Sequence, residues 1–144
     1  MLEMLKARKE ALQERGVKGF TLMEMLIVIA IIAVLVAIAI PVLGAQLDRA
    51  KATTDEANIR DGYASAQVMY LQDEITASTA YYLQKDGSVA AGADNTNAYE
   101  CQGNSSNLGA DINLPVDLDS WSAGDKITFT FDASGNLTIA AVAS

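Results

Sequence analysis

A continuous apolar run constrains this chain more than any other feature of its sequence. From Met25 to Ile40, sixteen residues pass without a charged or hydrogen-bonding side chain, and Glu24 is the only ionisable group in 20–43. A helix over 22–43 would be about 33 Å long, which matches the hydrocarbon thickness of a bilayer. A helix that is apolar on every side is either a membrane span or buried in a large protein. Because 144 residues are too few to bury it, the sequence predicts a membrane span.

The distribution of charge predicts how this span is oriented. Residues 1–19 carry five basic and three acidic side chains, a net charge of +2, so the total of −8 leaves −10 on residues 20–144. Basic flanks stay in the cytoplasm, which predicts that the acidic remainder is exported. Such an acidic product argues against nucleic-acid binding, which needs a clustered basic surface.

The remaining composition argues against catalysis. The chain has no His, which removes the commonest general base and transition-metal ligand. It also has one Cys, which cannot form an intramolecular disulfide or a CxxC metal site. Since no phosphate loop, nucleophile–base pair or redox motif appears either, we expect a protein that is not an enzyme and has no cofactor.

Two ordinary interpretations of the apolar run compete with a more specific one. A secretory signal peptide could be cut after Ala39, because residues 37–39 have the small-residue pattern of a cleavage site. A single-pass anchor could instead hold an extracellular binding module. Neither explains Glu24, because an unpaired carboxylate near the end of a span costs a few kcal/mol unless it reaches the headgroups.

The residues around Glu24 resemble the N-terminus of a type IV prepilin. The sequence Gly19-Phe20-Thr21-Leu22-Met23-Glu24 follows a basic leader, and the apolar run behind it ends at Pro41. The resemblance implies that a prepilin peptidase cleaves after Gly19 and methylates the new amino group of Phe20. It also implies that the span stays in the mature protein and that Glu24 and Pro41 serve filament assembly.

Each matched residue also has a physical reason. Gly19 lacks a Cβ, which suits close approach of a protease to the scissile backbone. Cleavage would leave an ammonium on Phe20, and Glu24 lies one helical turn further on, where it could neutralise this charge or that of the next subunit. An unpaired carboxylate among bundled spans would be expensive, so pairing with an incoming amine would fix the register of a filament.

These residues predict a structural subunit of a type IV pilus. It would be inserted in the cytoplasmic membrane as a single-pass precursor, cleaved by prepilin peptidase, and polymerised by the pilus machinery into a homo-oligomeric helical filament on the bacterial surface. A pseudopilin of a type II secretion or competence system would share every residue used so far. A membrane-anchored binding module would instead keep residues 1–19 and form no polymer.

The sequence divides into four predicted parts: a leader, 1–19; a span, 20–43; an amphipathic half of the same helix, 44–75; and an exported head, 76–144. Within 44–75, the apolar residues recur at helical spacing, and Glu56 and Arg60 are placed for an i,i+4 ion pair. The stripe consists of Ile59, Tyr63, Ala66 and Tyr70, widened by Val68, Leu71 and Ile75.

The head is predicted to be rich in β-structure. Residues 126–131 alternate apolar and polar side chains, and 137–142 follow after a turn-forming Asp-Ala-Ser-Gly-Asn, which indicates a hairpin. Residues 81–83 are predicted to form an earlier strand. Because a lone hairpin is marginal in water, these strands must cover the apolar face of the helix. The predicted fold class is therefore α+β, with a long N-terminal helix packed on a small antiparallel sheet.

Two further features of the head carry weak functional predictions. Asp117, Asp119 and Asp125 are candidate calcium ligands, but their spacing fits no EF-hand, and a solvated acidic loop is favoured. Cys101 is a free thiol, an intermolecular bridge or a buried small hydrophobe, of which the last is favoured.

Overall fold

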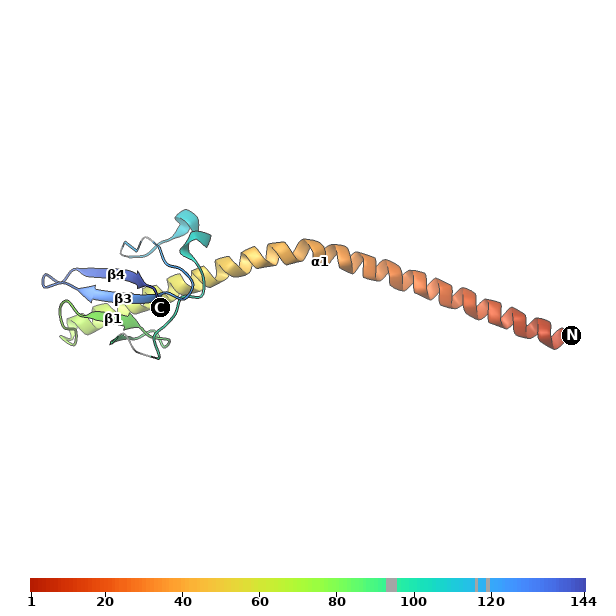
Figure 1. The fold of residues 1–144 in the computed structure, drawn as a ribbon, viewed down its shortest axis with the longest axis horizontal. Coiled ribbons are helices and arrows are strands. Elements are labelled where there is room, and N and C mark those ends of the chain that lie inside the picture. Colours follow the sequence, from red (N-terminus) through yellow and green to blue (C-terminus); the bar gives the residue numbers. More distant parts are fainter. Residues whose placement is uncertain (93–95, 116, 119) are drawn as a thin grey trace. The chain divides into compact units, whose positions relative to one another are not determined.

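The longest element of the fold is helix α1, which spans Leu2–Leu71 and continues across Pro41 (Figure 1). The computed structural model describes residues 1–92, 96–115, 117, 118 and 120–144, apart from the side chains of 12–20. The chain divides into two compact units, Met1–Gly44 and Ala45–Ser144, and α1 contributes to both. We call them the N-terminal unit and the head unit.

Helix α1 ends at Leu71, earlier than the predicted end near Ile75. Asp73 adopts the left-handed conformation with φ 56°. Its amide donates to the Tyr70 carbonyl, and the Glu74 amide donates to the Met69 carbonyl. These two bonds form a Schellman motif, which satisfies the last helical carbonyls and turns the chain away. No Gly marks this end of the helix, and Asp tolerates the left-handed region better than most residues.

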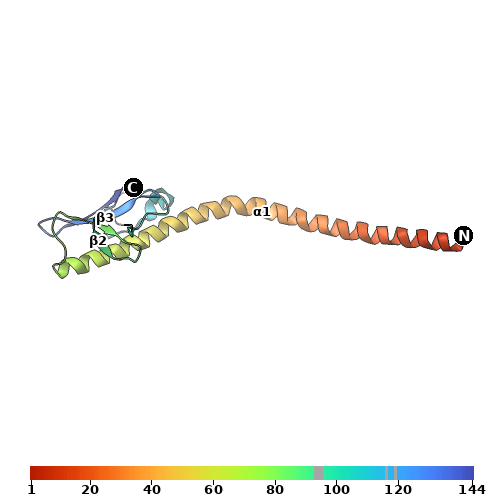
Figure 2. The ribbon, with the colours of Figure 1, turned by 60° about the horizontal axis from the view of Figure 1, so that its bottom comes forward.

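The strands form one antiparallel sheet in the head unit. They are β1 (Ala80–Leu83), β2 (Val89–Ala91), β3 (Lys126–Phe131) and β4 (Leu137–Val142), in the order β2-β1-β3-β4. The sheet lies along the C-terminal part of α1 (Figure 2). The predicted α+β class is confirmed, as are the hairpin of 126–131 with 137–142 and the earlier strand at 81–83. Strand β2 was not predicted.

Short turns with capping aspartates connect the paired strands. Asp132 Oδ1 accepts bonds from the amides of Ser134 and Asn136 between β3 and β4. Asp86 Oδ1 likewise accepts bonds from the hydroxyl and the amide of Ser88 between β1 and β2. These hydrogen bonds hold the pKa of both carboxyls below the usual value, because they favour the charged form.

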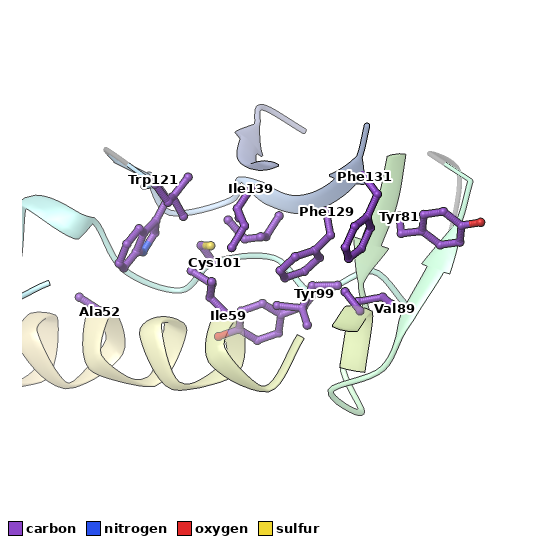
Figure 3. Close-up of a cluster of buried hydrophobic side chains, with 14 of the residues drawn as sticks. Ala52, Ile59, Tyr81, Val89, Tyr99, Cys101, Trp121, Phe129, Phe131 and Ile139 are labelled. Atoms are coloured by element: carbon purple, nitrogen blue, oxygen red, sulfur yellow. The ribbon is translucent and has the colours of Figure 1, made fainter. Parts of the chain in front are cut away.

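The core lies between the sheet and one face of α1. Figure 3 shows Phe129 and Phe131 of β3 in this core with Ile59 of α1. Gly62 permits the close approach, because a Cβ there would lie 2.6 Å from Leu83 Cδ1 and 2.7 Å from Phe129 Cζ. The side chains that are fully buried include Ala52, Ile59, Ala66, Leu83, Ile127, Phe129 and Phe131.

The buried face of α1 is narrower than predicted. Ile59 and Ala66 are fully buried, and Tyr63 packs on the core cluster. Val68 and Leu71, expected to widen the stripe, are instead 53% and 80% exposed. The reason is geometric: Val68 lies nine residues after Ile59, which at 3.6 residues per turn is two and a half turns and the opposite side of the helix.

Polar contacts fix the region 105–115 to α1. It contains two short 3-10 turns, η1 (Ser105–Asn107) and η2 (Gly109–Asp111). The predicted pair is confirmed, with Arg60 Nη2 2.6 Å from Glu56 Oε1. Both side chains also bind the backbone of Asn113. The Arg60 guanidinium donates to the Asn113 carbonyl, and the Asn113 amide donates to Glu56 Oε1. Arg49 adds an exposed ion pair with Asp111 at 2.7 Å.

Candidate processing and assembly segment

The apolar part of the N-terminal unit consists of exposed side chains. All sixteen large apolar side chains between Leu22 and Leu43 are exposed, from 46% for Val36 to 65% for Ile40. At about 1.5–3 kcal/mol for each side chain, removing them from water would gain on the order of tens of kcal/mol. Within the described residues, the segment Thr21–Leu71 is long and apolar enough to cross a membrane, judged by length and composition.

The residues predicted to direct processing and assembly all lie on this helix. Gly19 and Phe20 are within α1, but their side chains are outside what the structure describes. Glu24 is exposed, and none of the ion pairs between described residues includes it. Pro41 also lies in the helix, where its missing N–H removes one backbone hydrogen bond. The segment therefore offers, one turn beyond the predicted cleavage site, a carboxylate that forms no ion pair with another described side chain.

Two of the three candidate calcium ligands, Asp117 and Asp125, are described by the structure. Among the described residues, no group of three or more Cys, Asp or Glu side chains is placed to hold a metal ion. Asp119 lies outside the described residues, and Asp117 is exposed. Asp125 is used within the protein, because its Oδ2 accepts a bond from the Ser122 amide at 2.8 Å.

The favoured interpretation of Cys101 agrees with its position. Its side chain is free of a disulfide and 3% exposed within the core cluster. Burial, with the nearby carboxylates of Asp55 and Asp125, raises the pKa of the Cys101 thiol to about 12. A thiol held neutral in this way is a poor nucleophile, so Cys101 packs as a small apolar side chain.

Sequence reasoning missed two buried acids on α1. Asp55 is 0% exposed and Glu56 8% exposed, although acidic residues are rarely buried without partners. The donors to Asp55 come from residues 99–121, more than forty positions away in the sequence, and Glu56 is bound by the distant Asn113 amide as well as by Arg60. No local pattern marks such a position. The sequence predicted the pairing of Glu56 with Arg60 but not the burial of Glu56.

Comparison with known proteins identifies the class of the N-terminal segment. Residues 15–40 match the family described as the prokaryotic N-terminal methylation motif. The match includes Gly19, Phe20 and Glu24 and ends just before Pro41. An exposed apolar helix that carries this motif is similar to the N-terminus of prepilins.

A curated relative narrows the class further. The chain is 51% identical over 59 residues to the type IV wide pilus major component PilA4 of Thermus thermophilus. The alignment covers 41% of this chain, and the chain spans less than half, 44%, of that relative's length. No solved structure matches the chain. The resemblance to type IV pilins inferred from the sequence is therefore confirmed.

Proposed function

We propose that this chain is a structural subunit of a type IV pilus. The observation that carries the proposal is the exposed apolar helix, most of which lies within the match to the methylation motif. Sixteen exposed apolar side chains need a bilayer before assembly and the same helices of other subunits afterwards. In a homo-oligomeric helical filament, the apolar helices of neighbouring subunits would cover one another. The relative of this chain in Thermus thermophilus is a pilus component.

The proposed maturation begins at the membrane. The precursor is held in the cytoplasmic membrane as a single-pass protein, with its basic leader in the cytoplasm and its acidic head exported. Prepilin peptidase cleaves between Gly19 and Phe20 and methylates the new amino group of Phe20. The pilus assembly machinery then moves the subunit from the membrane into a filament on the cell surface.

The proposed assembly contact joins Glu24 of one subunit to the amino group of another. Cleavage creates a positive charge at Phe20, and Glu24 is an exposed carboxylate that no described basic side chain neutralises. Placed among bundled apolar helices, either charge alone would carry a large desolvation cost, so the pair fixes the axial register. Pro41, which lacks a helical N–H, gives the helix a point where it can bend to suit the bundle.

Mass spectrometry of the mature protein tests the maturation directly. We expect a chain that begins at methylated Phe20. An intact N-terminus would support a membrane-anchored binding module, and a chain that begins at Ile40 would support an ordinary signal peptide. Either result would contradict the proposal. Electron microscopy of sheared surface material then separates long pili from the short pseudopilus of a secretion system.

The variant Glu24→Ala tests the assembly contact. We expect normal cleavage and membrane insertion but at least a tenfold loss of filaments, because the amino group of the incoming subunit loses its partner. Asp48→Ala is the matched control, since it removes an exposed acid from the same helix in the head unit. Normal filaments from Glu24→Ala, counted by electron microscopy, would show that Glu24 has no such role.

A further inference from the structure

The Asp55 carboxylate is buried without an ion-pair partner. It lies on α1 between the buried side chains of Ala52 and Ile59 and is 0% exposed. Among the described residues, the ion pairs join Arg49 to Asp111 and Arg60 to Glu56, and neither includes Asp55. A buried charge of this kind persists only where hydrogen bonds replace the lost water.

Four donors surround the two oxygens of Asp55. Oδ1 accepts bonds from the Tyr99 hydroxyl at 2.6 Å and the Gln102 amide at 2.8 Å. Oδ2 accepts bonds from the Gly103 amide at 2.8 Å and the Trp121 indole N–H at 3.3 Å. An ionised carboxylate only accepts, and it has about four lone-pair sites, so the set of donors matches it. Burial and the bond to Asp55 also raise the pKa of Tyr99, which keeps its hydroxyl a donor.

All four donors belong to one region that has little regular structure. Residues 99–121 contain the two 3-10 turns but no strand among their described residues. The region nevertheless lies directly on the helix, because a Cβ at Gly103 would be 2.7 Å from the Ala52 backbone nitrogen. Within the region, the Ser105 amide donates to the Trp121 carbonyl and the Trp121 amide donates to Ser105 Oγ, which joins its last residue to its first 3-10 turn.

No covalent link closes this region. Cys101 lies within it and is the only cysteine of the chain, so an intramolecular disulfide is impossible. Small exported domains commonly close such a loop with a disulfide. Asp55 connects α1 to positions 44 to 66 residues away in the sequence, which is the type of long-range link that a disulfide provides.

We propose that Asp55 is a noncovalent clamp that holds residues 99–121 against α1, in the structural role of a disulfide. The clamp acts on one region rather than on the whole head. The sheet has its own support in the pairing of β1, β3 and β4 and in the burial of Phe129 and Phe131. Loss of the carboxylate therefore loosens 99–121 while the strands stay paired. Among the described residues, the side-chain bonds of this region to α1 then include those of Glu56 and Arg60 with Asn113 and of Arg49 with Asp111. This inference does not depend on the proposed filament function.

Asp55→Asn in the full chain, held in detergent micelles, tests the clamp. The amide keeps one acceptor oxygen but replaces the other with an NH₂ group, which faces N–H donors and cannot bind them. Hydrogen exchange by mass spectrometry compares peptides from 99–121 with peptides from 126–142. We expect exchange in 99–121 to rise at least tenfold and exchange in 126–142 to stay within twofold. Asp61→Asn, an exposed acid on the same helix, is the matched control and should change neither.

The comparison of hydrogen exchange between 99–121 and 126–142 decides the outcome. Unchanged exchange in 99–121, or an equal rise in both sets of peptides, would overturn the proposal. If Asp55→Asn does not fold, Tyr99→Phe takes its place in the same experiment. This variant removes one of the four donors and leaves the carboxylate in place. It should raise exchange in 99–121 several-fold and leave 126–142 unchanged, and a rise of equal size in the two regions would again contradict the clamp.

Discussion

The two units of the chain differ in the exposure of their apolar side chains, although one helix contributes to both. In the N-terminal unit, Ile27, Ile32 and Leu35 are more than half exposed. In the head unit, Ile59, Phe129 and Phe131 are completely buried. The overall hydrophobic content of 51% therefore combines two sets of apolar residues with different environments. One is a surface that needs a bilayer or other subunits, and the other is the core of a small domain.

This difference also explains where polar groups are found. The head unit buries Asp55 and Glu56 and satisfies both with hydrogen bonds from its own chain. The N-terminal unit exposes Glu24 with no ion-pair partner among the described residues. Buried acids in the head fix its internal structure, whereas the exposed acid in the span is available to a second molecule. The contrast makes the head unit the part whose stability a single chain determines.

The largest effect on the stability of the head unit is expected when one of its buried aromatic side chains is truncated. A truncation in the N-terminal unit provides the comparison. Phe129→Ala should lower the free energy of unfolding of the head by about 3–5 kcal/mol, because it leaves a cavity at a fully buried site. Ile32→Ala, at a site 53% exposed in the other unit, should change it by less than about 0.5 kcal/mol. Denaturant titration in micelles, followed by fluorescence of the single Trp121, measures both. Equal losses would mean that the two units unfold together.

A smaller effect is expected from paired glycine substitutions on α1. Gly62→Ala places a Cβ 2.6 Å from Leu83 Cδ1, and overpacking of this kind costs about 1–3 kcal/mol, more than the helical preference of Ala returns. Gly44→Ala meets no atom within 4 Å and should cost nothing. The same denaturant titration compares the two variants. A neutral Gly62→Ala would show that the sheet can move away from the helix.

The sequence was informative wherever the signal is local. Alternation of Ile127, Phe129 and Phe131 predicted β3 with its correct bounds, and a turn-forming sequence located β4. The motif from Gly19 to Glu24 is also local, because the proposed function requires a peptidase and a neighbouring subunit to act on a linear segment. Strand β2 escaped prediction because Val89–Ala91 is three residues long and contains two alanines, which leaves no alternation to detect.

What could not be predicted depends on contacts between distant parts of the chain. Nothing near Asp55 distinguishes it from Asp61, an acid on the same helix that remains exposed. The difference arises because Gln102, Gly103 and Trp121 bring their N–H groups to one position and not the other. Likewise, the exposure of Val68 became clear only when the phase of the helix was fixed by the residues that pack on the sheet.

The smallest effect on the pH dependence of the free energy of unfolding near neutral pH is expected from the Cys101 thiol. Its pKa is about 12 in the folded head and near the ordinary value of 9.0 in the unfolded chain. Because the folded state binds the proton more tightly, this group contributes no pH dependence below about pH 9, and its stabilising contribution is lost as the pH rises from 9 towards 12. Cys101→Ala should therefore flatten the alkaline decline in the free energy of unfolding and leave only the part due to Tyr99, whose pKa is also raised.

Alkylation distinguishes this buried thiol from an accessible one. At pH 8 and without denaturant, iodoacetamide should modify Cys101 at least 100-fold more slowly than in the unfolded chain, because only the thiolate reacts. The double variant Cys101→Ala/Ala133→Cys moves the single thiol to the exposed turn between β3 and β4 and should react at the unfolded rate. Rapid alkylation of the unaltered protein would mean that the region around Cys101 opens readily, and that the head unit depends on neighbouring molecules for its cover after all.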